Sequence, residues 1–468
     1  MRILFYAVIG AAAAVLFYQL FIPPIAGLAD QGDFIRTIGR FGYGPRHRGT
    51  LKYVYVEPTY VRDPAYRAPE WEQANSEYLF VAAALLVNQL VSRDGMLDIR
   101  IVGLVHVVAF LGAFARLLSV TRRVRCYPLL WIGALLALTD VGYAVYWNSL
   151  YTEPASCIFF LLLLAETVEI GWKAQLSGPN ACRWILWAAL WVLAKSQNAP
   201  LGLLLGLFAF RLAFWTRSQH VRVATVLGGC ALLGCAAFDV LTMPMGPRMS
   251  AAYDMVFSAI LVESKDPRAD LRVLGLDPDL ARYAGTGAWT AGTVFPKLAA
   301  SGVLGANVTI FTVERFYLRR PARLWRHLKA ALPKITFVRP EWYGNFEPSA
   351  GVPPAALSQR FNLWSGFHEH VLPRFSKWIV LALAAWPPVA LWIWIRERNQ
   401  VRRRRVELFA LLPLCCLTAM FASVFGDSYD FVKHMYLFNL LLDACMLCAA
   451  VACCQRLIKI GATASLKR

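Results

Sequence analysis

The chain has 468 residues, of which 58% are hydrophobic and 16% charged, and its mean hydropathy is +0.48. This balance excludes a disordered polymer, argues against an ordinary soluble enzyme and favours a membrane protein. The 48 Lys and Arg residues against 29 Asp and Glu leave a formal charge of +19. In an apolar chain such an excess indicates cytoplasmic loops held at anionic lipid rather than nucleic-acid binding.

Apolar runs predict an all-α polytopic membrane protein. A spanning helix needs about 20 mostly apolar residues, and seven runs meet or approach that length: 3–22, 100–119, 154–170, 222–242, 377–395, 406–424 and 435–453. Three further runs at 127–146, 184–196 and 199–215 are shorter or interrupted. We therefore expect about ten transmembrane helices. All 11 cysteines fall in or beside apolar runs, which argues against a disulfide framework.

The positive residues predict the orientation. With the N-terminus inside, every expected cytoplasmic connection carries Lys or Arg, most densely Arg396–Arg405. Short positive loops stay in the cytoplasm, so we expect both termini there. Two long outer loops then remain, 23–99 and 243–376, the second mostly helical with interfacial helices. We expect Pro321 to break the helical stretch Phe311–Leu332 into two pieces. The expected organisation is an N-terminal transmembrane module of about seven spans (1–242), an extracytoplasmic segment (243–376), and a C-terminal module of three spans with a cytoplasmic tail (377–468).

The first outer loop contains two carboxylates just after the Pro23-Pro24 stop, Asp30 and Asp33, followed by Arg36. Carboxylates so close to hydrocarbon are costly unless solvated or paired, which makes them functional candidates. Helix capping by Asp30 and neutralisation of Asp33 by Arg36 are the competing interpretation.

Later outer loops add polar groups at the same depth. Glu153 lies before Pro154 in the second, where it suits either catalysis or the first turn of a helix. Lys195 and Gln197 lie in the third, and Lys433 and His434 in the last, beside Asp427 and Asp430. A lone Lys at a helix end also fits snorkelling to headgroups, but cations from two loops near carboxylates favour a phosphate site.

This arrangement resembles the GT-C-fold glycosyltransferases that use polyprenyl-phosphate sugars, and more narrowly the bacterial hexose transferases of S-layer and glycan biosynthesis. The matching stretches are GDFIR at 32–36, NSLYTEP at 148–154, KSQNAP at 195–200, YDMVFSAIL at 253–261, LGLDPDLARYAGT at 274–286, YGNFEPSAGVPP at 343–354, RFNLWS at 360–365 and KHMYLFNLLLD at 433–443.

The resemblance implies a GT-C-like fold and a site at the outer face. It makes Asp33 the expected catalytic carboxylate and leaves metal dependence open, because Asp30 is the only acid close to Asp33 in the sequence. No other cofactor is expected. The expected site comprises the catalytic candidates Asp33, Asp30 and Glu153, the donor-phosphate cations Lys433, His434, Lys195 and Arg36, and the cavity residues Tyr151, Gln197 and Asn148.

The residue types suit transfer of a hexose from a polyprenyl-phosphate donor to a glycan or glycolipid acceptor. A carboxylate accepts the proton of the attacking hydroxyl, and cations stabilise the departing phosphate. Direct displacement inverts the anomeric carbon. Two alternatives remain: a transporter or flippase of lipid-linked sugars, and a polymerase or ligase that uses polyprenyl-diphosphate glycans. The expected partners are the lipid-linked donor, the acceptor and membrane lipids, with no nucleic acid.

Overall fold

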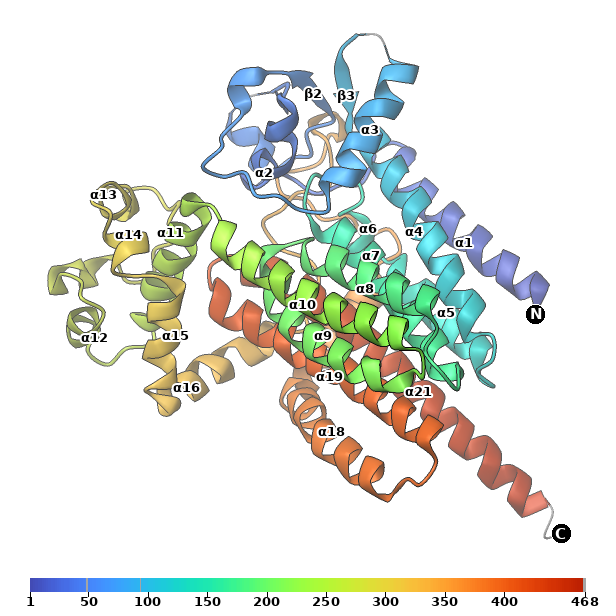
Figure 1. The fold of residues 1–468 in the computed structure, drawn as a ribbon. Coiled ribbons are helices and arrows are strands. Elements are labelled where there is room, and N and C mark those ends of the chain that lie inside the picture. The colour runs from blue at the N-terminus through green and yellow to red at the C-terminus, as the bar shows by residue number, and fades with distance from the viewer. Residues whose placement is uncertain (48, 93, 466–468) are drawn as a thin grey trace.

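The computed structural model describes residues 1–47, 49–92 and 94–465 and is mostly helical (Figure 1). Eight of its helical segments are long and apolar enough to cross a membrane. They correspond to the seven longest predicted spans and to the run at 199–215. These segments are α1 (Arg2–Phe21), α4 (Ile99–Thr121), α7 (Glu153–Trp172), Ser196–Trp215 around α9 (Ala199–Leu212), α10 (Gln219–Thr242), Leu372–Arg396 around α18 (Ser376–Arg396), α19 (Gln400–Gly426), and Tyr436–Ile458 of α21 (Tyr436–Ser465).

The other two predicted spans form shorter helices within the same bundle. They are α5 (Tyr127–Leu138) and α8 (Gly178–Val192). At 1.5 Å per residue, the 15 residues of α8 cover little more than 20 Å, less than a typical hydrocarbon core. The helix α8 packs against α7 and α10, and α5 packs against α21.

Proline residues set where several of these helices begin. Pro154, Pro179 and Pro200 each lie in the first turn of a helix, where the missing N–H costs nothing because the first turn has no intrahelical acceptor for it. In α7, Pro154 directly follows Glu153, which is the first residue of the helix. The sequence thereby places an acid at the N-terminal end of a buried helix.

The connections that carry Lys or Arg meet at one end of the bundle, which we call the basic end (residues 121–127, 171–178, 211–219 and 396–405). Arg405 Nε donates to the Gly171 carbonyl at 2.9 Å. Arg404 donates to the Ala174 carbonyl, and Arg211 pairs with Glu407 at 2.7 Å. These cations therefore bind carbonyls and a carboxylate at the helix ends. They also concentrate positive charge at one end of the bundle.

The opposite end, which we call the polar end, contains residues 139–153, 193–199 and 427–435 and the two long loops (Figure 1). The first loop contains a small antiparallel sheet that the sequence analysis did not predict. Its strands are β1 (Tyr43–Pro45), β2 (Thr59–Arg62) and β3 (Met96–Asp98), paired in the order β1-β2-β3 with Tyr60 opposite Pro45 and Leu97. The short helices α2 (Ile35–Ile38) and α3 (Tyr78–Val91) complete this loop, and α6 (Val141–Ala144) lies nearby.

The second long loop is mostly helical and contains its own buried cluster around Tyr253, Phe257, Val313 and Tyr317. Its helices α15 and α16 are separated at Pro321, the break that the sequence predicted. The elements of this loop and of the last one are α11 (Met245–Asp254), a π-helical turn (Met255–Ile260), α12 (Pro267–Val273), α13 (Phe295–Ala300), α14 (Val303–Ala306), α15 (Ile310–Leu318), α16 (Pro321–Ala331), α17 (Leu363–His370) and α20 (Phe431–His434).

Gly103 in α4 lies in close contact with Asn148, which predicts the effect of a substitution. A Cβ at this position of α4 would lie 1.9 Å from the Asn148 amide oxygen, whereas a Cβ at Gly112 of the same helix meets nothing within 4 Å. We expect Gly103→Ala to lower the free energy of unfolding by about 1–3 kcal/mol, because overpacking forces a buried neighbour to shift. Thermal unfolding in detergent measures this, with Gly112→Ala as the control. Equal melting temperatures for the two variants would contradict the prediction.

Candidate functional site

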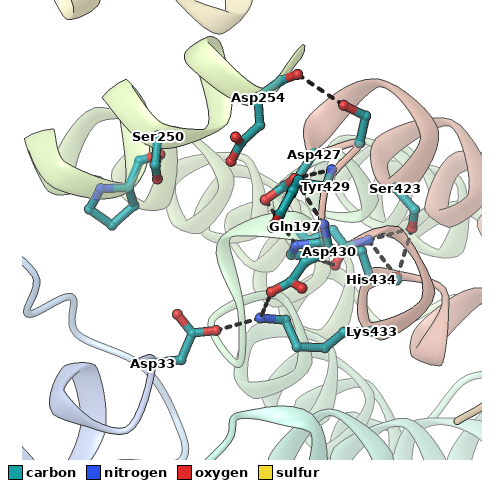
Figure 2. Close-up of polar contacts among 12 residues, drawn as sticks. Asp33, Gln197, Ser250, Asp254, Ser423, Asp427, Tyr429, Asp430, Lys433 and His434 are labelled. Carbon is teal, nitrogen blue, oxygen red and sulfur yellow. Dashed lines mark hydrogen bonds and ion pairs between the residues drawn. The ribbon is translucent and has the colours of Figure 1, made fainter. Parts of the chain in front are cut away.

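Lys433 lies at the centre of the polar end. Its ammonium is 2.7 Å from Asp33 Oδ2 and 2.8 Å from Asp430 Oδ2 (Figure 2). The side chain is only 4% exposed. Burial disfavours the ammonium, but the charges of Asp33 and Asp430 outweigh that effect and raise the pKa of Lys433 well above its usual value. The cation therefore stays charged inside the protein and joins the first loop to the last.

Asp33 lies just before α2, and one turn of chain brings Arg36 back to it. The Arg36 guanidinium is 3.0 Å from Asp33 Oδ1, so each carboxylate oxygen faces a different cation. Burial acts to raise the pKa of Asp33, but the charges of Arg36 and Lys433 lower it by more. The pKa of this carboxyl therefore lies well below its usual value. We call Asp33, Arg36, Asp430 and Lys433 the Lys433 cluster.

Two tyrosine rings line this cluster. Tyr151 and Tyr343 are parallel to within 8°, with centroids 6.3 Å apart. The Lys433 ammonium is 5.6 and 5.7 Å from their centroids, within the range of a cation–π contact. Tyr343 donates a hydrogen bond of 2.6 Å to Asp430, and Tyr151 donates one of 2.9 Å to the Ala29 carbonyl. The rings therefore help to hold the cation and its acids in place.

Glu153 and Lys195 form a second ion pair beside the Lys433 cluster, at 2.6 Å. Glu153 is buried at the start of α7, whereas Lys195 is one-fifth exposed and precedes the turn that leads into α9. The pair therefore connects two neighbouring helix ends, and the Lys195 side chain remains partly exposed.

His434 and Gln197 form a third group. His434 Nδ1 lies 3.2 Å from Gln197 Oε1, and its Nε2 lies 3.4 Å from Asp427 Oδ2. Gln197 in turn donates to the His434 carbonyl at 2.8 Å. Burial acts to raise the pKa of Asp427, but the hydrogen bond and charge of His434 lower it overall. The ring of His434 is thereby held with both nitrogens occupied.

Asp30 and Asn148 make contacts that shape the loops. Asp30 Oδ1 accepts the backbone N–H groups of Gly32 at 2.7 Å and Phe34 at 3.1 Å, and Oδ2 lies 3.5 Å from Lys52. The helix α2 begins only at Ile35 and has Phe34 as its N-cap, so Asp30 stabilises the turn before the helix and does not cap it. Burial raises the pKa of Asp30. The Asn148 amide donates to the carbonyls of Leu20 and Ala26, both at 2.8 Å. Neither residue lies among those that line the pocket described next.

A pocket open to solvent joins the first two groups. It has an empty volume of about 490 Å³, and its walls come from the first loop, the start of α7, the turn before α9 and the end of α10. The lining residues are Asp33, Arg36, Thr37, Gln73, Asn75, Leu150, Tyr151, Thr152, Glu153, Ala194, Lys195, Ser196 and Asp239. Of the predicted residues, Asp33, Arg36, Tyr151, Glu153 and Lys195 therefore share one cavity.

The sequence left open whether the site binds a metal ion. Across residues 1–47, 49–92 and 94–465, no group of three or more His, Cys, Asp or Glu side chains has the geometry of a metal site. At the Lys433 cluster an ammonium occupies the space between the two carboxylates. Asp33 and Asp430 are therefore paired with a cation of the chain itself.

Several residues at the polar end were not among the predicted site residues. Asp430 lies three residues before Lys433, a spacing that places both on one side of a helical turn and that the sequence already displayed. Tyr343 and Gln73 carry no such local signal, because their partners Asp430 and Asp239 are 87 and 166 residues away.

Asp254 is a further acid at the end of α11. Its Oδ1 accepts the Ala288 N–H at 2.6 Å, and Ser428 donates to its backbone carbonyl at 3.0 Å, which ties the second long loop to the last one (Figure 2). Burial, together with the charges of Asp427 and Asp430, raises the pKa of Asp254 to about 9. The carboxyl is therefore neutral at pH 7.

This shifted pKa gives a prediction for pH dependence. A carboxyl whose pKa rises on folding stabilises the protein below its unfolded pKa, and that contribution is lost as pH rises through the folded pKa. We expect thermal stability in detergent to fall between pH 4 and pH 9, and Asp254→Asn to weaken this fall and stabilise the protein by roughly 2–4 kcal/mol at pH 7. The exposed Asp279→Asn is the control. A variant that keeps the natural pH profile would contradict the prediction.

Comparisons with known proteins give two findings. The family model described as the YfdI N-terminal transmembrane domain matches residues 2–466. Among solved structures, the chain is similar to the archaeal oligosaccharyltransferase AglB from Archaeoglobus fulgidus, in complex with an inhibitory peptide and a dolichol-phosphate, at 14% identity and a TM-score of 0.40. That similarity covers 98% of this chain and 52% of AglB, so the chain spans about half of the length of that protein. None of the curated proteins matches the chain.

Proposed function

The chain belongs to the YfdI N-terminal transmembrane domain family, and we propose that this multi-pass membrane protein is a glycosyltransferase. It transfers a hexose from a polyprenyl-phosphate donor to a glycan or glycolipid acceptor, with the reaction at the polar end. The observation that supports this proposal is the Lys433 cluster, in which a buried ammonium and a guanidinium flank one carboxylate beside an open pocket.

The chemistry is a single displacement at the anomeric carbon. The acceptor oxygen forms a bond to that carbon while the bond to the phosphate oxygen breaks, and the bonding electron pair leaves with the phosphate. Asp33 takes the proton of the acceptor hydroxyl, and Lys433, Arg36 and Lys195 stabilise the departing anion. His434, which follows Lys433 in the chain, is held by Gln197 and Asp427. This single step inverts the anomeric configuration.

The low pKa of Asp33 is consistent with a base that becomes stronger when the donor binds. In the absence of ligand, Arg36 and Lys433 stabilise its ionised form and make it a weak base. A donor phosphate that binds the same two cations draws part of their charge away from Asp33. The pKa of the carboxyl then rises toward its ordinary value at the moment when the acceptor hydroxyl must lose its proton.

A transfer assay in liposomes tests this function. The purified chain is combined with a panel of polyprenyl-phosphate hexoses and membrane glycolipid extracts, and the sugar on the acceptor is measured. We expect transfer from at least one donor. Movement of the intact lipid-linked sugar across the bilayer without transfer would instead support a flippase, and transfer of whole glycans from polyprenyl diphosphate would support a polymerase or ligase.

The same proposal predicts the orientation in a bacterial cytoplasmic membrane. We expect a reporter fused within the loop at Gly351 to lie outside and one fused after Arg456 to lie in the cytoplasm, because the arginines of the basic end oppose translocation. The end of the predicted cytoplasmic tail, 466–468, lies outside the described residues. Fusions with alkaline phosphatase and a cytoplasmic fluorescent protein measure the orientation, and the reverse pattern would place the pocket on the wrong face for this reaction.

A further inference from the structure

The pocket at the polar end contains three buried polar atoms that have no hydrogen-bond partner among the described residues. They are Asp239 Oδ2, Asn75 Oδ1 and Arg36 Nε, and all three residues line the pocket. Buried polar atoms are nearly always paired in native proteins, so three unpaired atoms among the lining residues of one pocket mark these residues as candidates for contact with a ligand. Two of these atoms accept hydrogen bonds and the third donates one.

Asp239 is the most constrained of the three. It lies one turn before the end of α10 and is 1% exposed. Gln73 donates to its Oδ1 at 2.7 Å and to its backbone carbonyl at 3.0 Å, and Ser196 donates to the Gln73 oxygen at 2.7 Å. This chain of bonds orients the carboxylate and leaves Oδ2 without a partner among the described residues.

Asn75 is held in a similar way. Its amide nitrogen donates to the Gln73 carbonyl at 3.0 Å, which fixes the side chain and leaves its oxygen unpaired within the described part of the chain. Arg36, also from the first loop, contributes a donor, while its terminal nitrogen pairs with Asp33. The unpaired groups are therefore positioned before any ligand binds.

The charges of the pocket limit which ligand these groups can take. Arg36 and Lys195 disfavour a metal cation, and the unpaired oxygens of Asp239 and Asn75 disfavour a second phosphate, whose oxygens are acceptors as well. A sugar ring fits both conditions, because it is neutral and each hydroxyl both donates and accepts a hydrogen bond. The ring hydroxyls would meet the two acceptors and the donor together.

We propose that Asp239, Asn75 and Arg36 form a subsite for the hydroxyl groups of a hexose ring. This inference rests on the proposed function and adds the residues that recognise the sugar. The ring then lies in the same pocket as Asp33 and Lys195, beside the groups assigned to proton and phosphate. Both the transferred hexose and the terminal sugar of the acceptor have this chemistry.

Deoxy sugars test the subsite. One arm compares a donor hexose with its 2-, 3-, 4- and 6-deoxy forms, and the other arm does the same for the acceptor sugar. For the natural chain we expect one deoxy form to lower kcat/KM by about 10- to 100-fold, because a hydrogen bond to a charged group is lost. In Asp239→Asn and Asp239→Ala, that penalty should shrink to less than about 3-fold, and the arm that responds identifies which sugar occupies the subsite.

Thr225→Val is the matched control, since Thr225 is also buried on α10 but bonds to the Val221 carbonyl away from the pocket. It should keep the natural pattern of penalties. If the natural chain transfers sugar but Asp239→Asn retains every deoxy penalty in both arms, the subsite is overturned and the proposed function stands. If the natural chain transfers no sugar from any donor, both proposals fall.

Discussion

Asp33→Asn is expected to lower kcat for hexose transfer by about 10²–10⁴-fold, the usual contribution of a general base. The amide keeps the size of the carboxylate and still accepts a hydrogen bond from Lys433, but it cannot take the proton of the acceptor hydroxyl. The expected loss therefore lies in kcat rather than in KM for the donor. Initial rates over a range of donor concentrations measure both.

Two further variants make this result specific to Asp33. Asp33→Glu keeps a carboxylate, displaced by one methylene from the backbone, and should recover part of the rate that Asp33→Asn loses. Asp279→Asn removes an exposed carboxylate from the second long loop, where it pairs with Arg268, and should leave the rate unchanged. Full turnover by a folded Asp33→Asn protein would remove the general-base assignment, whatever the effect of the other variants.

Lys433→Met is expected to have the largest effect on stability. Removal of one partner of a buried ion pair costs about 3–5 kcal/mol, and here two carboxylates lose their common partner. The melting temperature in detergent should fall by several degrees. Because protonation of one carboxyl relieves the repulsion between Asp33 and Asp430, the difference from the natural chain should be smaller at pH 5 than at pH 8.

A second variant separates the structural role of Lys433 from its role in binding. Lys433→Met combined with Asp430→Asn removes one of the two unpaired charges, so it should regain part of the stability. Its KM for the polyprenyl-phosphate donor should nevertheless stay raised, because the cation that meets the phosphate is still missing. A double variant that binds the donor as well as the natural chain does would show that Lys433 only holds the fold together.

Much of the architecture could be predicted from the sequence, because spanning helices follow from local composition. The apolar length of runs such as 100–119 and 435–453 is a property of consecutive residues, as is the break at Pro321. The shorter α5 and α8 were harder to assign, since a run below about 20 residues is compatible with either a span or a buried helix. The small sheet was missed because strands of three or four residues carry little periodic signal.

The candidate site was predicted in part for the same reason. Asp33, Glu153, Lys195 and Lys433 were recognisable because each stands just outside an apolar run, where a charge is costly. Local spacing alone could not show that Lys433 faces Asp33 from 400 positions away.

The sequence by itself indicated which long apolar runs can cross a membrane and which connections between them carry charge, because both are properties of consecutive residues. Only the tertiary structure decided which side chains pair with one another. Lys433 forms ion pairs with Asp33 and Asp430, and Gln73 donates a hydrogen bond to Asp239. Those pairings depend on how the helices pack, which places side chains from distant loops within hydrogen-bond reach. That packing gives Asp33 two cationic partners and leaves one oxygen of Asp239 unpaired among the described residues.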